Sequence, residues 1–209
     1  MALGTYGELQ AAIAAWLARP GDPALVPFVA DFVRLAEARI NRELRARTMQ
    51  QRTTLLIEGG AIALPAEFLE LRTLRLEGDW AGGLELVSSE QLERLRSGWR
   101  GGRPRWFALM GGEIRVAPIP DGPYTVELSY WERIPPLTAA DQSNWLLEQA
   151  PDVYLYGALM EATAFIGNDE RLPLWSAAYE RAVTALQTAD DRATWSGSTP
   201  RARPDTALG

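Results

Sequence analysis

The chain has 209 residues, 47% of them hydrophobic, and a net charge of −6, so it can bury a sizeable core and is poorly suited to coating nucleic acid with a basic surface. All 21 cationic side chains are arginine, and the sequence contains no cysteine, histidine or lysine. These absences exclude cysteine nucleophiles, disulfides, thiolate or imidazole metal sites, Ser-His-Asp triads, Schiff-base lysines and the lysine of a phosphate-binding loop.

Residues 5–19 carry the signals of a first helix. Thr5 and Glu8 have the spacing of a capping box, and the apolar residues that follow recur at intervals of three and four. A second, longer helix is predicted from near Pro27 to about Arg47, because proline suits the first helical turn and apolar side chains again follow one face. Both stripes predict packing against a core.

The last turns of the second helix carry a cluster of arginines, Arg39, Arg42 and Arg45. Their charge complements the negative end of the helix dipole, and Arg39 with Glu43, like Glu43 with Arg47, has the i, i+4 spacing of a helical ion pair. A solvated helix face therefore accounts for the cluster. A contact surface accounts for it equally well, because arginine can hold a carboxylate or a phosphate in a bidentate fork.

From residue 53 the period changes from that of a helix to that of strands. We expect strands on both sides of a hairpin-like turn at 58–60. A strand at 69–77 is expected to turn and return at 84–87, followed by a short capped helix that ends at Gly98. The region is thus predicted to be rich in β structure.

Three further strands, at 105–110, 113–117 and 124–131, are expected to form an antiparallel meander. Apolar and polar residues alternate along the second and third of them, so the sheet should pack on a partner through one face. Trp80 and Trp99 stand beside glycines in expected loops. Exposed tryptophans mark partner surfaces, although packing over the sheet explains them as well.

Residues 152–166 are apolar on every side apart from Asp152 and Glu161, and such a helix is buried. Pro151 suits its first position. Its length is below the roughly 20 residues that span a bilayer, so we expect the central helix of a soluble bundle, and the sequence shows no secretion signal. A last helix, expected from 170–173 to about Arg192, should return antiparallel to it.

Carboxylates are the acid and base groups that remain, and together with eight tryptophans they could suggest sugar binding or a glycosidase pair. No two carboxylates are singled out by their spacing, however, and no Gly-x-Gly-x-x-Gly pattern follows an expected strand. Tryptophans are more often part of a core or an interface. We therefore predict that the chain is not an enzyme.

The order of these elements and their amino-acid sequences resemble those of the head-to-tail adaptor (connector) proteins of tailed bacteriophages. The resemblance covers residues 5 to about 197 and is carried by the runs FVRLAEARINRELRAR, LPAEFLELRTLRL, GGRPRWFALMGGEIRVAPIPDGPYTVELSYWERIPPL, NWLLEQAPDVYLYGALMEATAFI and ERLPLWSAAYERAVTALQTADDRATWSG. It implies an α+β fold, an antiparallel bundle of about four helices with a β-hairpin and meander insertion and an extended C-terminal arm. The corresponding domains are a bundle of residues 1–52 and 137–194, an insertion of 53–136 and an arm of 195–209.

The resemblance also implies a function. Adaptors of this kind form a dodecameric ring under the portal protein, join the DNA-filled head to the tail and continue the DNA channel without reading its sequence. The partners would be the portal, neighbouring copies and a downstream tail protein, with no membrane, cofactor or metal. The protein would reside in the virion, at the head-tail interface, after assembly in the host cytoplasm.

The same resemblance suggests roles for particular residues. The arm would dock on the portal through Trp195, Pro200, Arg201 and Arg203. The arginine cluster of the second helix would contact a neighbouring subunit or the portal, and the two loop tryptophans, Trp80 and Trp99, would face the tail or a neighbour. Two other classes stay open, an arginine-based nucleic-acid-binding module and, less favoured, a glycosidase-like enzyme. Salt-sensitive DNA retention would favour the first of these, and rings on the portal would favour the adaptor.

Overall fold

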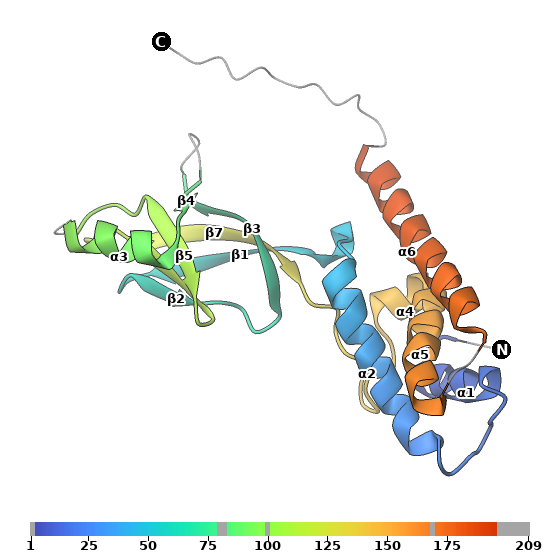
Figure 1. Cartoon of the computed structure of the whole chain (residues 1–209). Helices are drawn as coiled ribbons and strands as arrows, with labels where there is room; N and C mark the ends of the chain where they lie inside the picture. The colour runs from blue at the N-terminus through green and yellow to red at the C-terminus, as the bar shows by residue number, and fades with distance from the viewer. Residues whose placement is uncertain (1–2, 79–82, 99–100, 168–169, 196–209) are drawn as a thin grey trace. The chain divides into compact units, whose positions relative to one another are not determined.

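The computed structural model describes residues 3–78, 83–98, 101–167 and 170–195 (Figure 1). These residues form a mixed α+β protein with six α-helices and two β-sheets. They divide into a helical unit, from Met1–Arg47 and Ile134–Gly209, and a β unit, from Thr48–Arg133. The α+β class is therefore confirmed, while the antiparallel bundle of about four helices stays a prediction.

The helical unit is built around one helix, as the sequence predicts. Its helices are α1 (Tyr6–Trp16), α2 (Val26–Glu43), α4 (Trp145–Gln149), α5 (Pro151–Ile166) and α6 (Leu172–Trp195). Helix α5 contacts each of the other four, and eight of its residues are buried. Within the described chain, no helix combines the length and the apolar character that crossing a membrane requires.

Local signals set the starts of these helices. The Thr5 hydroxyl accepts a hydrogen bond from the Glu8 N–H, and the Glu8 carboxylate accepts one from the Thr5 N–H, which completes the predicted capping box. Pro151 opens α5, and the Asn144 side chain accepts from the Leu147 N–H at the start of α4. The Thr5 and Asn144 side chains each pair an N–H group that the helix itself leaves without a partner.

Helix α2 ends at Glu43, about four residues earlier than predicted. Leu44 is fully buried in an extended conformation, with φ −87° and ψ 135°, so the chain leaves the helix in order to bury this side chain. The Arg45 guanidinium then donates to the carbonyls of Asn41 and Leu44, at 2.9 and 2.6 Å. A 3-10 turn, η1 (Arg47–Met49), leads into the β unit.

Helix α6 begins where predicted and runs three residues beyond the expected end. Trp175, Tyr179 and Ala182 form its buried stripe. Leu174 and Ala189 follow the same apolar period along α6, and both are exposed. The apolar period of α6 therefore continues past the part of the helix that packs.

The β unit contains two sheets that share one core. Its elements are β1 (Gln50–Ile57), β2 (Ala61–Ala63), β3 (Phe68–Leu76), β4 (Glu85–Leu86), α3 (Ser89–Gly98), β5 (Trp106–Met110), β6 (Glu113–Ala117) and β7 (Tyr124–Glu132). One sheet has the order β1-β7-β3 and is antiparallel; the other has the order β2-β6-β5-β4, with β4 parallel to β5. The predicted helix at α3 and the hairpin of β5 and β6 are confirmed.

The two other expected hairpins are wrong. Strand β1 pairs with β7 along its whole length, whereas β2 crosses to the other sheet and pairs with β6. The crossing passes through Gly60, whose φ of +82° suits glycine and whose carbonyl accepts from Arg96 at 2.8 Å. Strand β4 likewise does not pair with β3 but pairs with β5, so each expected hairpin has its two strands in different sheets.

The expected meander also breaks after its second strand. Strand β7 lies between β1 and β3 and does not pair with β6. The segment between them holds three prolines, Pro118, Pro120 and Pro123, which cannot donate to a ladder and do not suit a tight hairpin. The long strand β7 therefore becomes the centre of the second sheet.

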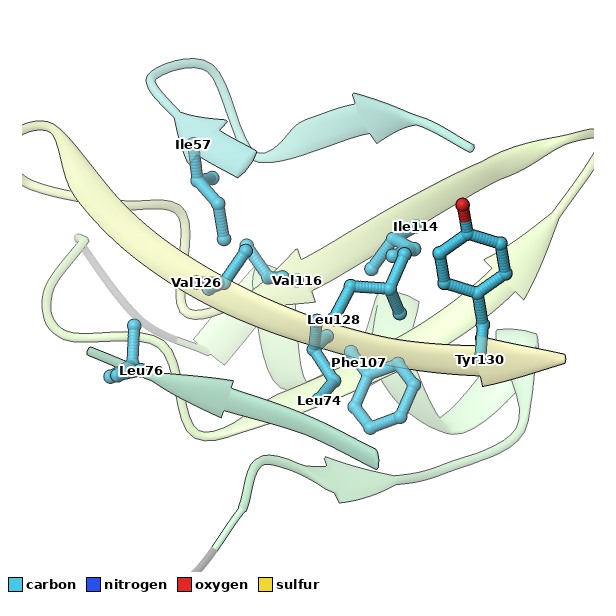
Figure 2. Close-up of a cluster of buried hydrophobic side chains, with 9 residues drawn as sticks. All are labelled: Ile57, Leu74, Leu76, Phe107, Ile114, Val116, Val126, Leu128 and Tyr130. Atoms are coloured by element: carbon cyan, nitrogen blue, oxygen red, sulfur yellow. The ribbon is translucent and has the colours of Figure 1, made fainter. Parts of the chain in front are cut away.

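The apolar faces of the two sheets meet, as the alternating pattern predicts. Figure 2 shows the nine buried side chains that meet there, contributed by five strands: Ile57, Leu74, Leu76, Phe107, Ile114, Val116, Val126, Leu128 and Tyr130. A buried aliphatic or aromatic side chain contributes about 1.5–3 kcal/mol. Strands from separate parts of the β unit therefore contribute side chains to one common core.

Candidate functional site

The arginine cluster of α2 is partly used within the chain. The Arg39 guanidinium donates to one Glu161 carboxylate oxygen of α5 from Nε at 2.8 Å and from Nη2 at 2.5 Å, and lies 3.8 Å from Glu43. The Tyr179 hydroxyl of α6 donates to Glu43 at 2.8 Å. These four side chains, which we call the Arg39 network, join three helices of the unit.

The pKa values of Arg39 and Tyr179 are both raised in the Arg39 network. The hydrogen bond to Glu161 raises the pKa of Arg39, so its guanidinium stays charged. Burial, followed by the hydrogen bond to Glu43, raises the pKa of the Tyr179 hydroxyl, which therefore remains a donor. The network can fix the packing of α2, α5 and α6. The i, i+4 pair of Arg39 with Glu43 agrees with the prediction.

The other predicted cluster members lie differently. Arg42 is exposed on α2, and Arg45 is half-buried against the carbonyls at the end of that helix. The expected pair of Glu43 with Arg47 requires a continuous helix and is wrong, because α2 ends between them. Instead, the Arg47 N–H donates to the Asp190 carboxylate of α6 at 2.7 Å. Of the three cluster residues, Arg42 presents its charge outward.

A second polar cluster, which we call the Glu37 cluster, is buried between α2, α5 and the segment before α4. Glu37, which is 9% exposed, accepts from the Leu137 N–H at 2.7 Å and from the Tyr154 hydroxyl at 3.4 Å. The Asn144 amide donates to the Tyr154 oxygen and to the Pro135 carbonyl, both at 2.7 Å. The cluster therefore holds the segment that returns from the β unit against α2.

Burial raises the pKa of Glu37, although the Leu137 N–H, the Tyr154 hydroxyl and the charge of Arg34 act in the opposite direction. A carboxyl whose pKa is higher in the folded state stabilises the fold at pH values below its unfolded-state pKa. This stabilisation is lost as the pH rises through its folded-state pKa. Ionisation of Glu37 therefore destabilises the helical unit as the pH rises above about 4.5, the ordinary pKa of this carboxyl. Sequence reasoning missed this residue, and its signal is a lone acid within the apolar stripe of α2.

A groove of the β unit lies along β3. It measures about 560 Å³ and is lined mainly by apolar side chains from β3, β4 and β5. Among the described residues that line it, Glu70 is the sole carboxylate, whereas glycoside hydrolysis requires two. The described parts of the chain also hold no group of three or more acidic side chains arranged to bind a metal ion.

Several residues singled out from the sequence lie outside the described residues: Trp80, Trp99, Pro200, Arg201 and Arg203. Trp195 is the last residue of α6, and its side chain lies outside them too. Their suggested contacts stay predictions.

Comparison with known families decides what this helical and β-rich chain is. A family model described as SU10 adaptor protein matches residues 4–204, almost the whole chain. The chain belongs to the SU10 adaptor protein family. The head-to-tail adaptor resemblance read from the sequence is therefore confirmed. No curated protein matches the chain.

The SU10 adaptor family is a family of structural phage proteins and not an enzyme family, and its members are expected in the virion. The described polar clusters agree with that character. The Arg39 network and the Glu37 cluster pair their charged and polar groups with one another across helices. Such an arrangement fixes packing.

Proposed function

We propose that this SU10 adaptor forms a dodecameric ring under the portal, joins the DNA-filled head to the tail and continues the DNA channel. The family match over residues 4–204 is the observation that carries the proposal. Its direct partners would be the portal, neighbouring copies and a downstream tail protein.

The proposal assigns a part to each region. The helical unit would build the ring, the insertion of 53–136 would face neighbours or the tail, and the arm of 195–209 would dock on the portal. Two features support this division: the helical and β units have separate cores, and α6 extends beyond its buried stripe to Trp195. Within the arm, Trp195 would supply a large apolar anchor, and Arg201 and Arg203 could each meet a carboxylate.

The exposed side chain of Arg42 makes it the member of the arginine cluster best suited to meet an acidic group on a neighbour or on the portal. Arg39 already pairs with Glu161 and Glu43. Trp80 and Trp99 would serve contacts with the tail or with a neighbouring copy.

Negative-stain imaging with and without purified portal tests the proposal. We expect rings capping the portal when both proteins are present. Unchanged portal particles, together with salt-sensitive binding of the chain to DNA, would instead support a nucleic-acid-binding module.

A further inference from the structure

Helix α6 has a packed first half and a projecting second half. Its buried side chains, Trp175, Tyr179 and Ala182, all belong to the first half. Among the α6 residues whose side chains the structure describes, those after Ala182 are half-buried or exposed. The helix has 24 residues against 16 in α5, so it is about 12 Å longer, and its last turns extend past α5 (Figure 1). Core packing therefore does not hold the second half.

The second half is tied to the rest of the helical unit through Asp190. The backbone N–H of Arg47 donates to Oδ2 of the Asp190 carboxylate at 2.7 Å, and Nε of the Arg47 guanidinium lies 3.9 Å from Oδ1. The Arg47 side chain is 57% exposed, so water and salt weaken this ion pair. The Asp190 side chain is 21% exposed, and its short bond to the backbone N–H is the stronger of the two contacts.

The position of Asp190 on α6 is otherwise unfavourable. It lies near the C-terminal end of the helix, where unpaired carbonyl groups carry a partial negative charge that disfavours a carboxylate. The neighbouring Asp191 experiences nearly the same repulsion, but it is exposed. The hydrogen bond from Arg47 offsets the repulsion for Asp190. The two adjacent acids therefore form a matched pair for an experiment.

We propose that Asp190 is a positioning residue for the C-terminal arm. Its hydrogen bond from the Arg47 N–H, which we call the α6 latch, holds the last turns of α6 in place and so fixes where the arm of 195–209 begins. This inference rests on the proposed docking of the arm on the portal. A helix end that is already ordered lowers the entropy cost of docking, because fewer residues have to be ordered at that moment.

Arg47 also gives the latch a second consequence. It is the first residue of η1 and the last residue of the helical unit before the chain enters the β unit. The latch therefore ties the helix that carries the arm to the point at which the chain leaves the helical unit. A force on the arm would act on this point through Asp190.

Hydrogen exchange of the full chain tests the latch without any partner. In Asp190→Ala the acceptor is lost, and we expect the amides of residues 187–195 to exchange about tenfold faster, as the loss of a hydrogen bond to a charged group implies. The amides around Tyr179 should exchange as in the unmodified chain, because that half of α6 is packed. Asp191→Ala is the matched control and should change neither half by more than about twofold.

Two further variants separate the latch from an ordinary surface ion pair. Arg47→Ala removes the guanidinium but keeps the backbone N–H, so the latch predicts exchange close to that of the unmodified chain. An ion pair would instead predict the same acceleration as in Asp190→Ala. The variant Asp190→Asn keeps an oxygen that can accept from the Arg47 N–H, and it should restore most of the protection.

Binding to purified portal then tests the positioning role. We expect Asp190→Ala to bind the portal several-fold more weakly than Asp191→Ala, and Asp190→Asn to recover most of the affinity. Circular dichroism melting checks that each variant is folded, which we expect because Asp190 lies outside the buried stripe of α6.

Equal exchange in Asp190→Ala and Asp191→Ala would overturn the latch, and so would an acceleration in Arg47→Ala as large as that in Asp190→Ala. Faster exchange in Asp190→Ala with an unchanged portal affinity would overturn the positioning role. Failure of the proposed function is a separate result: the unmodified chain would then not bind the portal at all, whereas the hydrogen exchange of the chain alone would be unaffected.

Discussion

Replacing Leu159 by alanine tests whether α5 is the centre of the helical unit. The Leu159 side chain is fully buried, on the helix that contacts α1, α2, α4 and α6. Removing a buried leucine side chain loses its transfer free energy and leaves a cavity, at a cost of about 2–5 kcal/mol. For a chain of this size, each kcal/mol lowers the melting temperature by about 2–4 °C. We therefore expect a decrease of about 4–20 °C.

The assay is thermal unfolding followed by circular dichroism at 222 nm, which reports mainly on the helices. Leu174→Ala is a matched control, because Leu174 is 62% exposed on α6 and its truncation should change stability by no more than about 0.5 kcal/mol. If Leu159→Ala melts like the unmodified chain, α5 is not the core that we describe. If both variants lose the same stability, burial does not govern the effect.

Three further outcomes follow from the site. Arg39→Ala should lower the melting temperature because Glu161 loses its partner, whereas Arg42→Glu should leave melting unchanged and weaken assembly on the portal; the reverse pattern would show that the roles are exchanged. The melting temperature of Glu37→Gln relative to the unmodified chain should rise between pH 4.5 and 7, because the variant has no carboxyl to ionise, and a constant difference would contradict the raised pKa of Glu37. A chain ending at Asp191 should melt normally yet lose portal binding, and an affinity within twofold of the full chain would refute the docking arm.

The helix starts could be predicted because their signals are local. Thr5 and Glu8 lie within one turn of each other, and Pro151 occupies a position at which a missing N–H group is tolerated. The end of α2 could not be predicted in this way. It depends on the burial of Leu44, which is decided by tertiary packing.

The pairing of the strands could not be predicted from local patterns, again for a physical reason. The alternation in β7 correctly predicts that Val126 and Leu128 are buried, but it does not state which strands lie beside them. The neighbours of β7 are β1, which ends at Ile57, and β3, which ends at Leu76, whereas β7 begins only at Tyr124. Such long-range pairing follows from the shared core of the two sheets, and no local pattern records it.

The sequence predicts one of the two ion pairs of Arg39 and none of the contacts of Glu37. The arginine spacing on α2 indicated an ion pair with Glu43, and the structure adds Glu161, which comes from a distant helix. Glu37 was overlooked because a single acid within an apolar stripe resembles an ordinary interruption. Its partners, Leu137 and Tyr154, lie 100 and 117 residues away along the chain.

The central claim, that this adaptor assembles on a portal, is tested most directly by measuring mass with and without that partner. Sedimentation of the isolated chain should show monomers or weak association, because the central helix of each copy is buried within its own chain. Added to purified portal, the chain should co-sediment as a complex whose mass corresponds to a dodecameric ring of adaptor subunits on the portal. A stable dodecamer at low concentration without the portal would contradict assembly on that partner, and a portal that sediments unchanged would contradict the adaptor function itself.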